Sequence, residues 1–267
     1  MRSRWLAVLA AAGLTLAVAG CAPDDAGNSA NAAPQGAGSS SGLTGDITVF
    51  AAASLTESFN QIGKDFEAAN PGTKVIFNYG GSSGLATQIN QGAPADVFAS
   101  ASPSTMKTVT DAGDGVGEPT VFVKNQLVIA VPKGDPKGIK TLNDLTKPGL
   151  KVALCAEQVP CGAAAKKALA AADVDLKPAT LEQDVKAALQ KVKLGEVDAA
   201  LVYRTDAKAA AGDVEGVEFP ESAGAINDYP IVVLANAPNK PVAQAFVEYV
   251  KGDKGQAVLT QAGFQAP

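Results

Sequence analysis

Small hydroxyl residues and glycines follow several predicted strands, at the points where helices are expected to begin. Three runs show this pattern: Ala51-Ala52-Ala53-Ser54, Gly81-Ser82-Ser83-Gly84 and Val159-Pro160-Cys161-Gly162. Gln183-Asp184-Val185 lies at a fourth junction of the same kind. The first turn of a helix leaves its backbone N–H groups without intrahelical partners and carries roughly half a positive charge. Such groups favour the binding of a compact anion.

These junctions contain no Lys or Arg, so the donors that they offer are neutral. Neutral donors suit a fully ionised oxyanion, whereas an anion that keeps a proton, such as hydrogen phosphate, also needs an acceptor. Asp184 is a possible acceptor, so this discrimination stays open. Simpler roles also exist: Ser54 has the capping-box spacing to Glu57 that opens a helix, and Tyr203 ends an apolar strand, where tyrosines commonly pack into a core.

The elements that must position these junctions alternate between strand and helix from Asp46 onward. Strands are predicted at 47–50, 74–79, 96–99, 126–131, 151–154, 199–203 and 231–235. Helical patterns begin after Ser54 and at 85–91, 141–145, 163–172, 183–194, 242–250 and 255–261. Repeated βα units predict an α/β fold of two lobes, each a mostly parallel sheet flanked by helices. We expect lobe 1 at 46–125 plus 236–267 and lobe 2 at 126–235, with the ligand at the carboxyl ends of the strands.

Composition excludes much enzyme chemistry. The 267 residues include no histidine, so a Ser-His-Asp triad, a Cys-His dyad and a His-ligated zinc site are impossible. The sequence has no P-loop, so we do not expect ATP hydrolysis. The formal net charge of −5 argues against a nucleic-acid partner.

The N-terminus has the pattern of an export signal. Arg2 and Arg4 precede an apolar run at 5–20, which is short for a membrane-spanning helix of about 20 residues. The run ends in Val18-Ala19-Gly20-Cys21, which resembles a bacterial lipobox. We therefore expect residues 1–20 to be a signal peptide and Cys21 to be lipidated. Residues 21–45 would form a flexible tether on the outer face of the cytoplasmic membrane. A plain secretory signal and an uncleaved anchor are the alternatives.

Two further cysteines, Cys155 and Cys161, lie close together in the sequence. An exported protein occupies an oxidising compartment, so we predict a disulfide between them. Two free thiols are the alternative.

From Asp46 onward the chain resembles the molybdate-binding proteins of bacterial ABC transporters. The resemblance rests on Ile47-Thr48-Val49-Phe50-Ala51-Ala52-Ala53-Ser54-Leu55, Gly81-Ser82-Ser83-Gly84-Leu85-Ala86, Gly92-Ala93-Pro94-Ala95-Asp96-Val97-Phe98, Val159-Pro160-Cys161-Gly162, Asp184-Val185, Leu201-Val202-Tyr203 and Gly263-Phe264. It implies a two-lobed fold like that of type II periplasmic binding proteins. It also implies capture of molybdate or tungstate, with sulfate, thiosulfate or another small oxyanion as the alternative ligand.

Carried over by position, the resemblance implies specific roles for five residues. Ser54 and Ser82 would each donate a hydroxyl and a backbone N–H, Tyr203 would donate its hydroxyl, and Cys161 and Val185 would donate backbone N–H groups. Ser83 and Asp184 are second-tier candidates. The metal would arrive as the molybdate oxyanion, without direct cation ligands, a cofactor or catalysis. The implied partners are a membrane permease and its ATPase, and we expect a monomer.

Overall fold

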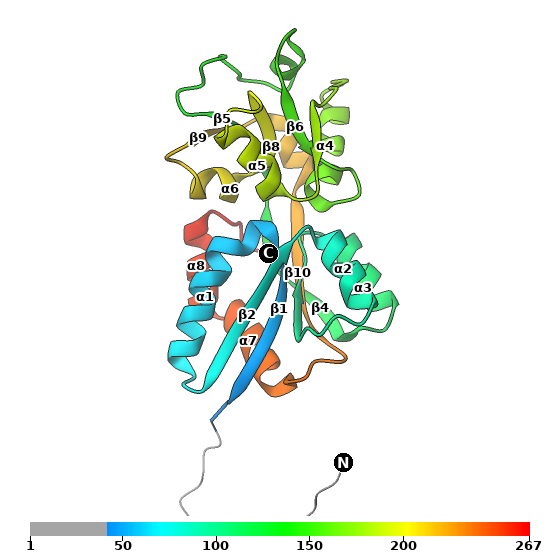
Figure 1. Cartoon of the computed structure of the whole chain (residues 1–267), viewed down its shortest axis with the longest axis vertical. Coiled ribbons are helices and arrows are strands. Elements are labelled where there is room, and N and C mark those ends of the chain that lie inside the picture. Colours follow the sequence, from blue (N-terminus) through cyan, green and yellow to red (C-terminus); the bar gives the residue numbers. More distant parts are fainter. Residues whose placement is uncertain (1–41) are drawn as a thin grey trace, which may run out of the picture. The chain divides into compact units, whose positions relative to one another are not determined.

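Two five-stranded sheets organise residues 42–267, the part of the chain that the computed structural model describes (Figure 1). The signal-peptide prediction, the Cys21 lipidation prediction and the tether up to residue 41 lie outside the described residues. Within 42–267, no helix combines the length and the apolar character that a membrane crossing requires.

The first sheet has the strand order β2-β1-β3-β10-β4. Its strands are β1 (Gly45–Ala52), β2 (Thr73–Gly80), β3 (Val97–Ala99), β4 (Gly115–Asn125) and β10 (Asn227–Leu234). β1 runs parallel to β2 and β3, whereas β10 runs antiparallel to β3 and β4. The helices that accompany this sheet are α1 (Thr56–Ala69), α2 (Ser82–Asn90), α3 (Pro103–Asp111), α7 (Lys240–Lys251) and α8 (Asp253–Ala262).

The second sheet has the order β7-β6-β8-β5-β9. Its strands are β5 (Leu127–Pro132), β6 (Val152–Cys155), β7 (Thr180–Glu182), β8 (Ala199–Tyr203) and β9 (Val214–Val217). The accompanying helices are α4 (Pro160–Ala171), α5 (Val185–Lys193) and α6 (Arg204–Ala209). Three short 3-10 helices complete the described elements: η1 (Ala53–Leu55), η2 (Asn143–Thr146) and η3 (Pro220–Ala225).

We use lobe 1 for residues 42–125 plus 227–267, and lobe 2 for residues 126–226. The chain passes from one sheet to the other at Gln126, between β4 and β5, and returns at Ile226, between η3 and β10. The predicted α/β fold with two lobes is confirmed. Each sheet is mixed rather than mostly parallel, because two of its four strand pairings are antiparallel.

The predicted lobe boundary at 235/236 differs from the observed sheets. The predicted strand at 231–235 corresponds to β10, which pairs with β3 and β4 in the first sheet and therefore belongs to lobe 1. β4 was not predicted, because Glu118 and Pro119 interrupt its apolar pattern. β4 forms the edge of the sheet, where a proline costs no hydrogen bond between strands.

An aromatic cluster packs α1 and α7 of lobe 1 together. The rings of Phe59, Phe66 and Phe246 are almost fully buried, and Phe246 meets the other two edge-on at centroid distances of 6.1 and 5.4 Å. The core therefore fixes the helices against the sheet.

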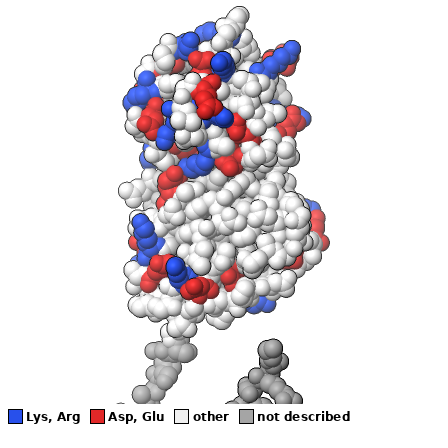
Figure 2. All heavy atoms as spheres, viewed as in Figure 1, with Lys and Arg blue, Asp and Glu red and all other residues white. Residues whose placement is uncertain are grey.

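On the face that Figure 2 shows, the Lys and Arg side chains of residues 42–267 are interspersed with Asp and Glu rather than gathered in one patch. This face therefore presents no concentrated basic surface.

Candidate functional site

A narrow cavity lies between the two lobes, at the carboxyl ends of the parallel strands. Lobe 1 lines it with Ala52, Ala53, Ser54, Gly80, Gly81, Ser82 and Ala101, and lobe 2 with Val159, Pro160, Cys161, Asp184, Val185 and Tyr203. All five residues predicted to bind an anion lie along this one cavity, and so does Asp184. The carboxyl ends of parallel strands are where α/β proteins place their ligands.

The cavity is small and almost free of charge. Its volume is about 10 Å³, close to the least that holds a water molecule. Asp184 is the single charged residue among those that line it. The Asp184 carboxylate caps α5 by accepting a hydrogen bond of 2.9 Å from the Ala187 backbone N–H. The polar groups left to face a ligand are therefore neutral hydroxyls and backbone amides.

Ser54 does not act as a helix cap, although its spacing to Glu57 fits a capping box. It lies within η1, and no side chain caps the start of η1 or of α1. The buried Ser54 hydroxyl lies instead 2.8 Å from the Tyr229 hydroxyl, and either group can donate. When Tyr229 donates, the Ser54 proton is free for a ligand.

Ser82 begins α2 and is almost fully buried. Its Oγ accepts a hydrogen bond of 3.0 Å from the Ala101 backbone N–H. Because this bond uses a lone pair of the oxygen, the hydroxyl proton remains available. Ser83, its neighbour, does not line the cavity, and its hydroxyl donates across the lobes to the Gln158 carbonyl oxygen at 2.6 Å.

Two backbone amides come from helix starts in lobe 2. Cys161 is the second residue of α4, and Val185 is the first residue of α5. Neither amide has a carbonyl partner four residues earlier within its own helix, because each lies in the first turn. The positive ends of both helices therefore meet at the cavity.

The predicted disulfide between Cys155 and Cys161 is confirmed. The two Cα atoms are 5.7 Å apart, and both residues are buried. The bridge joins the end of β6 to the first turn of α4. It therefore fixes the short loop that presents the Cys161 amide.

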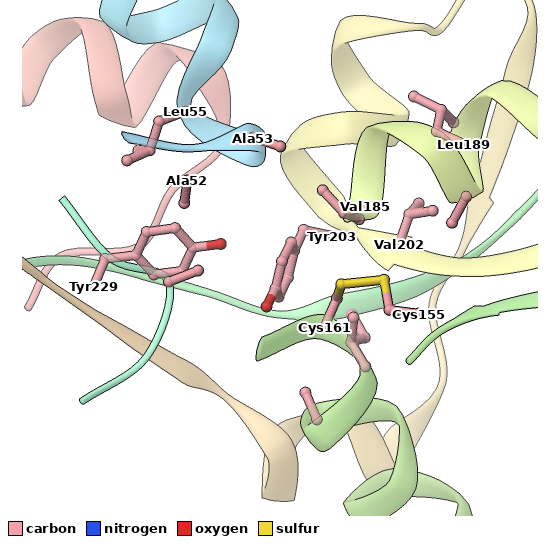
Figure 3. Close-up of a cluster of buried hydrophobic side chains, with 14 of the residues drawn as sticks. Ala52, Ala53, Leu55, Cys155, Cys161, Val185, Leu189, Val202, Tyr203 and Tyr229 are labelled. Carbon is pink, nitrogen blue, oxygen red and sulfur yellow. A yellow bond between two sulfur atoms is a disulfide. The ribbon is translucent and has the colours of Figure 1, made fainter. Parts of the chain in front are cut away.

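Tyr203 ends β8 and extends its hydroxyl toward lobe 1. Figure 3 shows its ring between the disulfide and Tyr229, and the two tyrosine ring centroids are 5.9 Å apart. The Tyr203 oxygen accepts a hydrogen bond of 2.9 Å from the Asn227 side-chain amide. Burial raises the pKa of Tyr203 well above its usual range, so the phenol keeps its proton at neutral pH.

Tyr229 and Asn227, which hold the donor hydroxyls of Ser54 and Tyr203, are not among the residues predicted from the sequence. Both lie on β10, and Tyr229 is fully buried. The useful signal was the polar run Asn227-Asp228-Tyr229 directly before an apolar strand. The predicted assignment of this segment to lobe 2 separated Tyr229 from Ser54, which it contacts although the two residues are 175 positions apart.

Residues 42–267 contain no cluster of three or more His, Cys, Asp or Glu side chains placed to hold a metal ion.

Two α/β lobes that enclose a small cavity between them define a two-lobed ligand-binding protein. The family model for bacterial extracellular solute-binding proteins matches residues 47–265, and the chain belongs to this family. It is therefore a solute-binding protein rather than an enzyme.

Named relatives include the molybdate-binding protein ModA of Mycobacterium tuberculosis strain H37Rv. It is 43 % identical over 267 residues, which cover 99 % of this chain and 100 % of the relative. The Azotobacter vinelandii periplasmic molybdate-binding protein has a TM-score of 0.71 at 21 % identity, covering 83 % of this chain and 99 % of that one. The sulfate-binding protein SubI of M. tuberculosis H37Rv has a TM-score of 0.70 at 21 % identity, covering 83 % and 86 %. At these identities the two structures support the fold alone.

Replacing both cysteines, as Cys155→Ser/Cys161→Ser, is expected to lower the free energy of unfolding by about 2 kcal/mol. Closing so short a loop restricts the unfolded chain by roughly that amount. Denaturant unfolding of the full chain measures the change, and the reduced wild-type protein is the control. Equal unfolding midpoints for the oxidised wild type and the double variant would contradict a stabilising role for the bridge.

Proposed function

We propose that this protein captures molybdate, and tungstate, between its two lobes and delivers the anion to an ABC permease. The observation that carries the proposal is the cavity between the lobes, where three hydroxyls and two helix-start amides meet with no Lys or Arg among the lining residues. The 43 % identity to a molybdate-binding protein over the full chain supports this choice of ligand.

Each proposed hydroxyl donor is held by another group of the protein. The oxygens of Ser82 and Tyr203 accept hydrogen bonds from Ala101 N and Asn227 Nδ2, which leaves their protons for the ligand. Ser54 is held by Tyr229. A dianion such as molybdate carries no proton that needs an acceptor, so a shell made only of donors can satisfy its oxygens. Donors fixed in advance also need little reorganisation on binding.

Capture requires the lobes to move apart and close again. In this structure the cavity volume is close to the least that holds a water molecule, so we expect a tetrahedral oxyanion to enter when the lobes are further apart. Gln126 and Ile226, where the chain crosses between the sheets, are the natural hinge positions. The anion would first meet the donors of one lobe, and closure would bring those of the other.

Binding of sulfate or thiosulfate is the alternative function. Molybdate, tungstate and sulfate are all tetrahedral dianions, so hydrogen-bond chemistry alone does not separate them. Selection would rest on cavity size in the ligand-bound state, where the longer metal–oxygen bonds need more room. The likeness of the fold to both molybdate- and sulfate-binding structures does not discriminate between them.

The partners follow from the same proposal. Cys21 would carry the lipid, and the predicted tether, shortened to residues 21–44 because Gly45 belongs to β1, would hold the folded lobes at the outer face of the cytoplasmic membrane. The closed form, as a monomer, would dock on a permease that a separate ATPase energises. The lipobox supports this arrangement, and so does membership of a family of extracellular proteins.

Isothermal titration of the full chain with molybdate, tungstate, sulfate and phosphate tests the ligand. We expect tight binding of the first two anions and little response to the others. Tight binding of sulfate or phosphate would preserve the mechanism but replace the ligand. No response to any of the four, from folded protein freed of bound anion, would contradict the oxyanion site.

The substitution Gly81→Ala tests closure. A Cβ at residue 81 would collide with the Gln183 carbonyl oxygen of the other lobe, although the backbone φ of −62° suits alanine. We therefore expect Gly81→Ala to fold with its lobes further apart and to bind molybdate at least about ten-fold more weakly. Gly84→Ala is the matched control, because its Cβ would meet no atom within 4 Å. Wild-type affinity in Gly81→Ala would argue against the closed arrangement as the binding form.

A further inference from the structure

Lys186 forms an ion pair that joins the two lobes. Its Nζ lies 2.8 and 2.7 Å from the two carboxylate oxygens of Glu57, on α1 of lobe 1. The same Nζ lies 3.0 Å from Oδ1 of Asp206, on α6 of its own lobe. Every other ion pair in the described part of the chain links two groups of one lobe. Lys186 is thus the point at which opposite charges connect the lobes.

On the lobe 2 side, the ion-paired residues adjoin two of the proposed donors. Lys186 directly follows Val185, whose amide faces the cavity. Asp206 lies three residues after Tyr203 and accepts a hydrogen bond of 3.2 Å from the Tyr203 backbone N–H. A contact that moves the Lys186 or Asp206 side chain therefore also moves the segments that carry Val185 and Tyr203, the proposed lobe 2 donors.

On the lobe 1 side, Glu57 is the second residue of α1 and follows Ser54 by three positions. Its carboxylate lies 2.7 Å from Lys186 Nζ. The pair therefore joins the segment that follows Ser54 to the segments that carry the lobe 2 donors.

The two carboxylates play different parts. Asp206 is fully buried, and burial raises its pKa to about 6 although Lys186 acts to lower it. A buried carboxylate needs a charged partner, so Asp206 accounts for Lys186 within lobe 2. Burial also opposes the charge on Lys186, but the two carboxylates outweigh it and raise the pKa of Lys186. Glu57 is about half exposed and needs no such partner, so its contact with Lys186 is an addition made between lobes.

We propose that Lys186 is a positioning residue of the anion site, held by Asp206 in lobe 2 and bound to Glu57 of lobe 1 when the lobes close. The ion pair stabilises the closed form and thereby slows release of the ligand. This inference rests on the proposed function, because the ligand whose release is slowed is the proposed oxyanion.

The variant Glu57→Gln removes the charge between lobes and leaves the buried Lys186–Asp206 pair in place. The matched control is Asp213→Asn, which breaks the pair of Lys193 and Asp213. Lys193 lies on the same helix, the pair distance is 3.0 Å, and the side chains are 33 % and 56 % exposed against 25 % and 54 % for Lys186 and Glu57. The control pair lies within lobe 2.

The measurement is the dissociation rate of radiolabelled molybdate from the full chain at pH 7.5, chased with unlabelled molybdate, together with the melting temperature without ligand. We expect Glu57→Gln to release molybdate about two- to five-fold faster, the size expected for a partly exposed pair. Its melting temperature should match that of Asp213→Asn, and the release rate of Asp213→Asn should match the wild type. Lys186→Arg, which keeps the charge opposite Glu57, should release molybdate as slowly as the wild type.

Wild-type release from Glu57→Gln, or an equal acceleration in Asp213→Asn, would overturn the proposal. Failure of the wild type to bind molybdate would instead count against the proposed function. In that case small-angle scattering of the ligand-free proteins decides the inference. A larger radius of gyration for Glu57→Gln than for Asp213→Asn supports a contact between lobes that favours closure, and equal values refute it.

Discussion

The proposed anion site must stabilise the two negative charges of a dianion without a Lys or Arg among the residues that line the cavity. Hydroxyls and backbone amides supply only partial charges, so several of them must converge on one point, and water must be kept out for their dipoles to be effective. No single loop carries enough donors. The architecture therefore brings six strand ends from two sheets to one narrow cavity.

The donors of the proposed site are held by buried partners. Tyr229 and Asn227 on β10 contact Ser54 and Tyr203, and the disulfide fixes the Cys161 loop. A hydroxyl that already accepts one hydrogen bond has fewer ways to turn, so its proton is directed before the ligand arrives. Burial keeps Tyr203 protonated and hence a donor. These contacts cost nothing at the moment of binding, which is how preorganisation raises affinity.

Contacts between the lobes combine rigidity with reversibility. They include the Ser83 hydrogen bond, the Asn227–Tyr203 hydrogen bond, the close approach at Gly81 and the Lys186–Glu57 ion pair. A receptor that must release its cargo needs closure to be favourable by only a small margin, and a few polar contacts provide such a margin.

Local signals in the sequence predict the α/β class and the disulfide and carry the family resemblance, and the resemblance in turn implies the five candidate donors. Hydroxyls and glycines at strand-to-helix junctions are visible in a few consecutive residues. Only the packing of the whole chain shows that β10 belongs to lobe 1, that Tyr229 rather than a capping role holds Ser54, and that Lys186 reaches Glu57 across the lobes. The two side-chain contacts join residues 175 and 129 positions apart. A strand's own pattern does not say which sheet it joins, since strand pairing is set by packing of the whole chain rather than by neighbours in the sequence.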